Sequence, residues 1–213
     1  MTIISGINCE NTIESIEMAK EAKEAGADGI LLMPPHMWLR FGMHKDAPYE
    51  YVKDVAEGAD IDIIIHLYPA TSKAFYPVGT LIKMCKEIEH VKCIKMGTRV
   101  TSIYEHDVRL LRQECPDISL ITCHDETLCV SWFPGMDGAL IGFAGCVPEI
   151  ICPAREVFAN PDKHTFKGGT GLVRPDLSHL PGHLWRRTAI RGSACTSQRG
   201  SCTAGRIYQW FNA

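Results

Sequence analysis

The chain has 213 residues and a mass of 23.7 kDa, enough for one domain and an appendage but too few for two full enzyme domains. Its content of 46% apolar and 22% charged residues excludes wholesale disorder, a collagen-like repeat and a disulfide-stapled miniprotein. The net charge of −3 conceals an uneven distribution. Residues 161–213 carry eight Lys or Arg against two Asp, whereas residues 1–160 carry 14 basic and 23 acidic side chains.

Residues 1–160 repeat a unit in which a short apolar run precedes a helical pattern. The first helix is expected from Thr12 to Ala25 and to end at Gly26. Alternating strands and helices favour a parallel sheet with crossover helices, so the prediction is an α/β fold, either a barrel or a doubly wound sheet. The predicted strands cover residues 3–7, 30–33, 61–68, 91–96, 118–123 and 139–143.

One predicted strand, residues 61–68, carries polar side chains on one face. Its odd positions are all apolar, whereas its even positions include His66 and Tyr68. An unpaired polar group in a buried strand is costly, so this face is expected to line a barrel interior or a site. A hydrogen-bonded core histidine is the interpretation favoured for His66 over a catalyst, and Tyr68 could cap a barrel with its hydroxyl in water.

A lysine close to the end of the next predicted strand is the strongest candidate for chemistry. Lys95 is expected to share a face with Val91 and Cys93. The C-terminal ends of parallel strands are where α/β folds place their active sites. An apolar setting lowers the pKa of a lysine and leaves a neutral amine available as a nucleophile. Without further support, a solvated or salt-bridged lysine is the simpler interpretation.

The remaining features indicate a cytoplasmic protein with a basic tail. The chain starts without a basic segment before apolar residues, so no secretory signal is expected. No membrane helix is expected either, because Pro148 and Glu149 interrupt the longest apolar stretch. Ten cysteines without a CxxC pair suggest free thiols in a reducing compartment. Residues 161–213 form a Gly/Arg-rich tail, predicted to be irregular; its arginines could contact nucleic acid, but a basic tail without that function is preferred.

Several short segments of residues 1–160 carry a family resemblance through their order and spacing. They are Ile4-Ser5-Gly6-Ile7, Ala25-Gly26-Ala27-Asp28-Gly29-Ile30-Leu31, Met33-Pro34-Pro35, Leu67-Tyr68-Pro69, Cys93-Ile94-Lys95, Asp137-Gly138-Ala139-Leu140-Ile141 and Val147-Pro148-Glu149. Together they resemble the dihydrodipicolinate synthase and N-acetylneuraminate lyase family. The resemblance implies a (β/α)₈ barrel and a class I aldolase, in which a lysine forms a Schiff base with pyruvate or a related 2-oxo acid.

The resemblance assigns roles to four residues of this sequence. Lys95 matches the Schiff-base lysine, and Tyr68 matches a tyrosine that relays protons during imine formation. Lys73 falls where many members carry an arginine near the mouth of the site, and it lacks the bidentate fork of arginine. Leu140 falls where the family has an apolar residue beside the bound 2-oxo acid. The reaction would need no metal and no organic cofactor, because the iminium is the electron sink. A homo-oligomer without membrane contacts is also expected.

The sequence departs from the family pattern at three points. The match begins at the family's third strand, so residues 1–160 are expected to form six of eight strand–helix units. The Gly-Thr-Thr-Gly-Glu motif of the family's second strand is absent from the sequence. Met37 stands where some members have a tyrosine that reaches into the neighbouring subunit. Residues 161–213 do not resemble the family's helical C-terminus.

These departures leave alternatives open. The chain could be a lyase that condenses or cleaves a 2-oxo acid and an aldehyde, a sugar-acid dehydratase or hydratase-aldolase of the same family, or an inactive barrel remnant that pairs with a complete subunit. An open barrel exposes two unpaired sheet edges, which favours the remnant. Cys123, His124 and Asp125 stand at the end of a predicted strand; because consecutive side chains of a strand alternate between its faces, we do not expect the three to meet one zinc ion.

Overall fold

The structure is a computed structural model that describes residues 2–159 and 207–208. Its strands are β1 (Ile3–Ile7), β2 (Gly29–Leu32), β3 (Asp62–Leu67), β4 (Val91–Met96), β5 (Ser119–Thr122), β6 (Gly138–Ala139) and β7 (Ile207–Tyr208). Its helices are α1 (Thr12–Glu24), α2 (His36–Phe41), α3 (Ala47–Ala59), α4 (Val78–Glu87), α5 (Thr101–Glu114), α6 (Leu128–Trp132) and α7 (Pro148–Ala159), with a 3₁₀ helix η1 (Gly142–Gly145). The first five predicted strands are confirmed to within one residue at each end.

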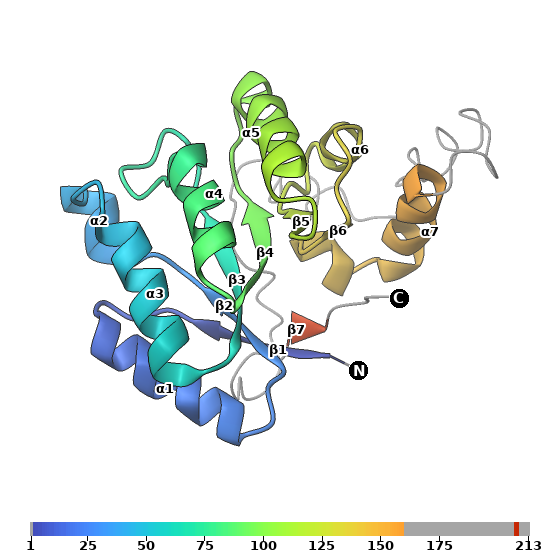
Figure 1. Ribbon diagram of the computed structural model, residues 1–213. Coiled ribbons are helices and arrows are strands. Elements are labelled where there is room, and N and C mark those ends of the chain that lie inside the picture. The colour runs from blue at the N-terminus through green and yellow to red at the C-terminus, as the bar shows by residue number, and fades with distance from the viewer. Residues whose placement is uncertain (1, 160–206, 209–213) are drawn as a thin grey trace.

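The sheet is part of a barrel. Strands β1 to β6 lie in chain order and every neighbouring pair is parallel. Figure 1 shows them curling into a half-barrel, with α1, α3, α4 and α5 along its outer side. Crossover helices on one side of a sequentially ordered parallel sheet are the arrangement of a (β/α) barrel. This settles the choice that the sequence left open between a barrel and a doubly wound sheet in favour of an incomplete barrel.

The first helix illustrates how local signals set the element boundaries. The Asn11 side chain accepts a hydrogen bond from the Glu14 N–H at 2.9 Å and caps the start of α1. Gly26 follows the helix with φ +92°, a left-handed conformation that is open to glycine at little cost. The predicted end of this helix at Gly26 is therefore confirmed.

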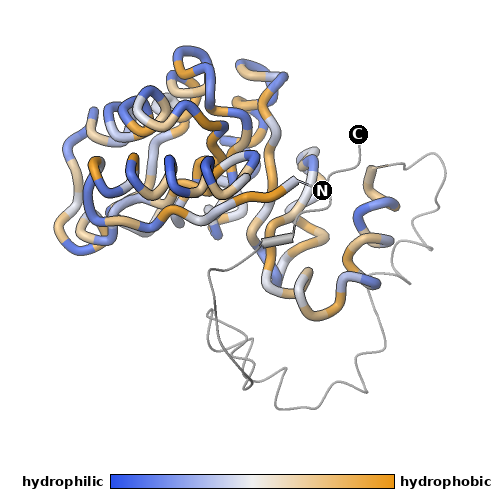
Figure 2. Tube along the Cα trace, turned by 90° about the horizontal axis from the view of Figure 1, so that it is seen from below, coloured by the Kyte–Doolittle hydropathy of each residue, from blue (hydrophilic) through white to orange (hydrophobic). Residues whose placement is uncertain are grey.

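Most of the core lies between the sheet and the helices. The odd positions of β3, predicted to form one apolar face, include Ile63, Ile65 and Leu67, and these residues pack against the helical layer. Figure 2 shows helices in which hydrophilic and hydrophobic residues alternate along the tube, as expected for helices with one face on a core. The helical side of this core includes Val52 and Leu111.

A second, smaller cluster lies on the inner face of the sheet, where a barrel has its interior. It takes one buried apolar residue from each of β1 to β5 and one that follows β6: Ile4, Leu31, Ile64, Cys93, Ile121 and Leu140. The prediction that Val91 shares this face with Cys93 is wrong. The register between β3 and β4 shifts between Ile63 and Ile64, so Val91 pairs with Ile63 and joins the outer core.

The sixth predicted strand is much shorter than expected. We expected residues 139–143 to be extended, but β6 ends at Ala139 and η1 begins at Gly142. The Gly142 and Phe143 N–H groups donate to the Asp125 carboxylate, at 3.2 and 2.9 Å, instead of continuing the ladder with β5. A carboxylate from the β5–α6 loop thus replaces backbone pairing at this edge.

The tail carries one element that we did not predict. Ile207 and Tyr208 form β7, which pairs antiparallel with Ile4 and Ile3 of β1. Figure 1 shows β7 beside the N-terminal strand. The other residues of 161–213, with their arginines and the Gly168–Gly171 run, lie outside the described residues, so the irregular tail and the boundary near residue 160 stay predictions.

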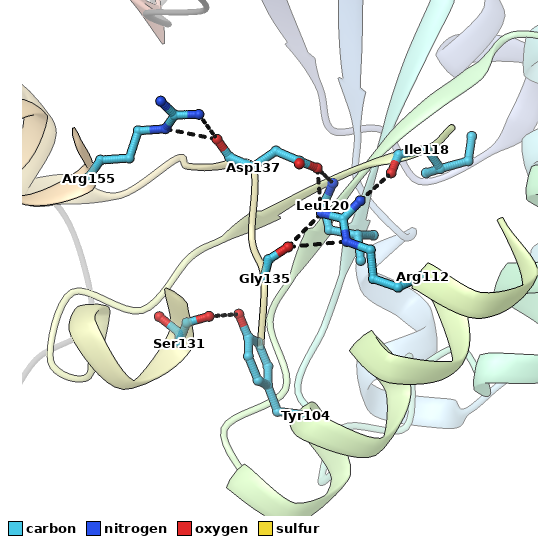
Figure 3. A network of polar contacts seen from close by, with 8 residues as sticks. All are labelled: Tyr104, Arg112, Ile118, Leu120, Ser131, Gly135, Asp137 and Arg155. Carbon is cyan, nitrogen blue, oxygen red and sulfur yellow. Dashed lines mark hydrogen bonds and ion pairs between the residues drawn. The ribbon is translucent and has the colours of Figure 1, made fainter. Parts of the chain in front are cut away.

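A polar network joins the last strands to α5 and α7 (Figure 3). The Arg112 guanidinium donates to the Gly135 carbonyl, with its Nη2 at 2.8 Å, to the Ile118 carbonyl at 3.2 Å, and to the Asp137 carboxylate at 2.6 Å. Asp137 also accepts from the Leu120 N–H at 2.7 Å. A single guanidinium therefore bridges three segments around β5 and β6.

We predict that Arg112→Ala lowers the free energy of unfolding by about 2 kcal/mol, because it removes charge-assisted hydrogen bonds and leaves the Gly135 and Ile118 carbonyls unpaired. Urea denaturation followed by circular dichroism measures the change. Arg109 lies exposed on the same helix, so Arg109→Ala is the control and should change stability by under about 0.5 kcal/mol. Equal losses in the two variants would contradict the role of the network.

Candidate active site

Lys95 is half-buried near the C-terminal end of β4, on the inner face of the sheet. Its register partners are His66 of β3 and Ile121 of β5. Burial lowers the pKa of the Lys95 amine below its ordinary value, and the nearby Cys123 and Asp125 oppose this effect only in part. The structure thus gives Lys95 the setting that favours a neutral, nucleophilic amine.

His66 stands directly beside Lys95 and is not hydrogen-bonded in the way we expected. Its Nδ1 atom is buried and has no hydrogen-bond partner among the residues that the structure describes. Burial, followed by the positive charge of Lys95, lowers the pKa of His66 to about 3. The interpretation of His66 as a hydrogen-bonded core histidine therefore fails for Nδ1. Its position in the register is the signal that sequence reasoning missed.

Tyr68 comes one residue after the end of β3, on the side of the sheet that also carries His66. The two rings meet edge to face, with centroids 5.0 Å apart. Tyr68 is half-buried, and burial raises the pKa of its phenol. Its hydroxyl is therefore protonated at neutral pH. The structure brings Tyr68, His66 and Lys95 to one corner of the inner face, and the catalytic roles of Tyr68 and Lys95 stay predictions.

The two predicted substrate-binding residues lie in different environments. Leu140 follows β6 and is buried in the inner cluster, which lies on the same face of the sheet as Lys95. Lys73 lies in the loop between β3 and α4, is exposed, and donates to the Arg40 carbonyl at 3.0 Å. The hydrogen bond holds Lys73 against the end of α2. Contact of either residue with a substrate stays a prediction.

The residues Cys123, His124 and Asp125 do not lie in a strand, so the alternation on which our expectation was based does not apply to them. β5 ends at Thr122, so the three follow it in a loop. Asp125 turns toward the backbone of η1, whereas His124 is buried with its ring 5.2 Å from that of Tyr104. Within residues 2–159 and 207–208, no three His, Cys, Asp or Glu side chains gather as a metal site would require.

A cavity of about 280 Å³ lies apart from this corner, between the start of α5 and α6. Its lining includes Thr98, Arg99, Tyr104, His124 and Ser131, but not Lys95. The Arg99 guanidinium forms an ion pair with Glu126 at its rim. The lining of the cavity comes from the loops that follow β4 and β5 together with α5 and α6.

A glycine allows β3 and β4 to approach closely beside Lys95. Gly97 follows β4, and a Cβ atom at this position would fall well inside contact distance of the Leu67 carbonyl oxygen. That oxygen belongs to backbone, which cannot rotate away as a flexible side chain can. The ends of β3 and β4, which carry His66 and Lys95, can therefore lie this close only because residue 97 is a glycine.

Comparison with known proteins decides the family. The model of the dihydrodipicolinate synthetase family matches residues 1–156. The chain belongs to this family. An uncharacterized DapA-like lyase of Thermofilum pendens is 26% identical over 156 residues, which cover 73% of this chain and 50% of that protein. The chain thus spans about half the length of the curated relatives it matches.

Solved structures agree on the fold. A monomeric dihydrodipicolinate synthase variant superposes with a TM-score of 0.75 and 18% identity over 90% of this chain and 60% of that chain. A Ruminococcus gnavus sialic acid aldolase, solved as a catalytic lysine mutant, superposes with a TM-score of 0.69 and 19% identity over 81% of this chain and 53% of that chain. The incomplete barrel predicted from the sequence is therefore shown. No described helix combines the length and the apolar character needed to cross a membrane.

We predict that Gly97→Ala destabilises the fold by about 1–3 kcal/mol, because the added methyl forces the ends of β3 and β4 apart. Chemical denaturation measures the loss. A Cβ atom added at Gly79 in α4 would meet no other atom within 4 Å. Gly79→Ala is therefore the control and should be neutral or stabilising by up to about 1 kcal/mol. A Gly97→Ala chain as stable as the Gly79→Ala chain would show that the close approach is not required.

We predict that Lys95→Met raises the free energy of unfolding by about 1 kcal/mol at pH 7, because an apolar side chain carries no desolvation penalty. Below the lowered folded-state pKa of Lys95, the native state bears the full penalty; it shrinks as pH rises through that pKa and disappears above the unfolded value of about 10.4. The gain should therefore be largest at neutral pH and fade toward pH 10.5.

Urea titrations at pH 7, 9 and 10.5 measure this dependence. Lys92 lies exposed on the same strand, so Lys92→Met provides the control, with a small effect that does not change with pH. A Lys95→Met gain that persisted undiminished at pH 10.5 would show that charge burial is not its cause.

Proposed function

We propose that the chain carries the Schiff-base centre of a lyase that joins a 2-oxo acid such as pyruvate to an aldehyde, or cleaves the product. The observation that carries this proposal is a half-buried lysine near the C-terminal end of a barrel strand, with its pKa lowered by burial. Membership of the family supports it, as does the catalytic lysine of the sialic acid aldolase whose fold the chain shares.

The proposed reaction begins at the Lys95 amine. Its lone pair attacks the 2-oxo carbon, the carbonyl oxygen takes up a proton, and loss of water leaves an iminium. The iminium accepts the electron pair released when a C3–H bond breaks, which gives an enamine. The enamine carbon then attacks an aldehyde, or the reverse sequence releases one. Tyr68 would move protons to and from the oxygen during imine formation.

Two residues are proposed to bind the substrate. Leu140 would pack against the apolar part of the 2-oxo acid, because it is buried in the cluster beside Lys95. Lys73 would attract an anionic group at the mouth of the site, provided that it exchanges its hydrogen bond to Arg40 for the substrate. The proposed reaction needs neither a metal nor an organic cofactor.

We also propose that the protein is a cytoplasmic homo-oligomer. The exposed apolar residues of α2 support self-association, since Met37, Leu39 and Phe41 present 50%, 39% and 73% of their surface to solvent. Free thiols support a reducing compartment, because the described cysteines form no disulfide.

A sugar-acid dehydratase or hydratase-aldolase would use the same imine.

The decisive experiment is borohydride reduction in the presence of pyruvate, followed by intact mass measurement and peptide mapping. We predict a reduced pyruvate adduct on Lys95 in the wild-type chain and none in the Lys95→Arg variant, because an arginine remains protonated and cannot form the imine. Lys92→Arg serves as the matched control and should be labelled as the wild type is.

The fold of each sample is checked by a thermal melt and its assembly by size-exclusion chromatography. An adduct absent from a wild-type chain that melts cooperatively would contradict the proposed function and favour an inactive barrel. An adduct on another lysine would place the centre elsewhere.

A further inference from the structure

We propose that His66 is a catalytic proton relay at the Schiff-base centre, and that it carries the proton which Lys95 must lose when the imine forms. The inference rests on the proposed function, since it concerns the same imine. The His66 imidazole stands beside the Lys95 amine, and its Nδ1 atom has no hydrogen-bond partner among the described residues.

The first observation is the register of the two strands. His66 and Lys95 are paired positions of β3 and β4, and neighbouring strands lie about 4.8 Å apart. The other paired neighbour of Lys95 is Ile121, which cannot accept a proton. Among the two residues directly flanking Lys95 across the strands, only His66 can therefore serve its amine.

The second observation is an unused hydrogen-bonding atom. His66 Nδ1 is buried without a partner in residues 2–159 and 207–208, and buried polar atoms without a partner are uncommon because they are costly. Nothing that the structure describes at this atom fixes the ring in one tautomer. A group brought in by the substrate, such as the hydroxyl of the carbinolamine, would supply the missing partner.

The third observation is the electrostatic coupling of the two side chains. The charge of Lys95 is a cause, second to burial, of the lowered pKa of His66. The ring is neutral while Lys95 is protonated, and its basicity rises once Lys95 has lost its charge. A neutral imidazole can accept a proton at one nitrogen and donate from the other, which is what a relay requires.

Lys95 Nζ forms a bond to the 2-oxo carbon while the carbonyl π electrons move to oxygen. His66 takes one proton from the nitrogen and gives one to that oxygen, which yields the neutral carbinolamine. The hydroxyl oxygen then gains a second proton, which comes from solvent, and the nitrogen lone pair expels it as water. One proton is consumed and one water is released, which leaves the iminium.

Tyr68 is the competing relay, and its position differs. It follows the end of β3 and contacts the edge of the His66 ring, whereas His66 lies at the level of Lys95 itself. The two hypotheses therefore make different predictions for the same measurement on single variants of each residue.

The test measures the rate at which the imine forms. Full-length chain is mixed with saturating pyruvate and quenched with borohydride at successive times, and the adduct on Lys95 is quantified by mass. For His66→Gln we expect the rise to slow by at least about tenfold, in line with the contribution of general acid–base catalysis, while the final amount of adduct stays near that of the wild type. Added imidazole should restore part of the lost rate.

A purely structural role would lower the final amount of adduct and would not respond to imidazole. His66→Phe provides a second variant, because it removes both nitrogens and leaves no buried polar atom; its thermal melt verifies the fold. Tyr68→Phe is measured in parallel. Wild-type rates in a folded His66→Gln or His66→Phe chain would overturn the inference, as would a loss confined to Tyr68→Phe.

The failure of the proposed function looks different. If the wild-type chain forms no adduct at any time, both proposals fall together. If the wild type and the His66 variants reach the same amount at the same rate, the Schiff-base centre stands and only the relay is lost.

Discussion

Lys95 carries an amine into the apolar inner face of a parallel sheet, where lost hydration makes its charged form costly. The surrounding elements serve to hold that amine in place. β3 and β5 flank it, the outer core fixes the strands against α3, α4 and α5, and Gly97 lets β3 and β4 end close together. A rigid scaffold is needed because a mobile lysine would reach water, and its pKa would return toward the ordinary value.

Strand β6 is held in place by polar contacts of the segments on either side of it more than by its own backbone pairing. β6 has two residues, too few for a stable strand on its own. Arg112 and Asp137 tie the segment before it to α5 and β5, and Asp125 anchors the segment after it. This arrangement positions Leu140, which immediately follows β6, in the inner cluster without a long strand to carry it.

Much of this fold could be predicted from local sequence. Apolar runs followed by helical spacing place the first five strands, and Asn11 and Gly26 mark the ends of the first helix. The order of the strands, and the placement of the candidate active site at their C-terminal ends, follow from the parallel pattern. Features that depend on contacts distant in sequence were missed: the register shift that moves Val91 to the outer core, the Asp125 carboxylate that binds the backbone after β6, and the pairing of β7 with β1.

For His66, the strand pattern predicts which face of the sheet the side chain lies on, but only the strand pairing shows which residue lies beside it. Its place on the polar face of β3 was evident from alternation alone, but its meaning depends on which residue of β4 stands opposite. Because the register shift lies before His66, extending the Ile63–Val91 pairing along the strands without the shift would place His66 opposite Ile94 instead of Lys95. Once the pairing is known, a half-buried amine stands beside an imidazole whose Nδ1 atom has no hydrogen-bond partner among the described residues, and sites of function are where such local rules are most often broken.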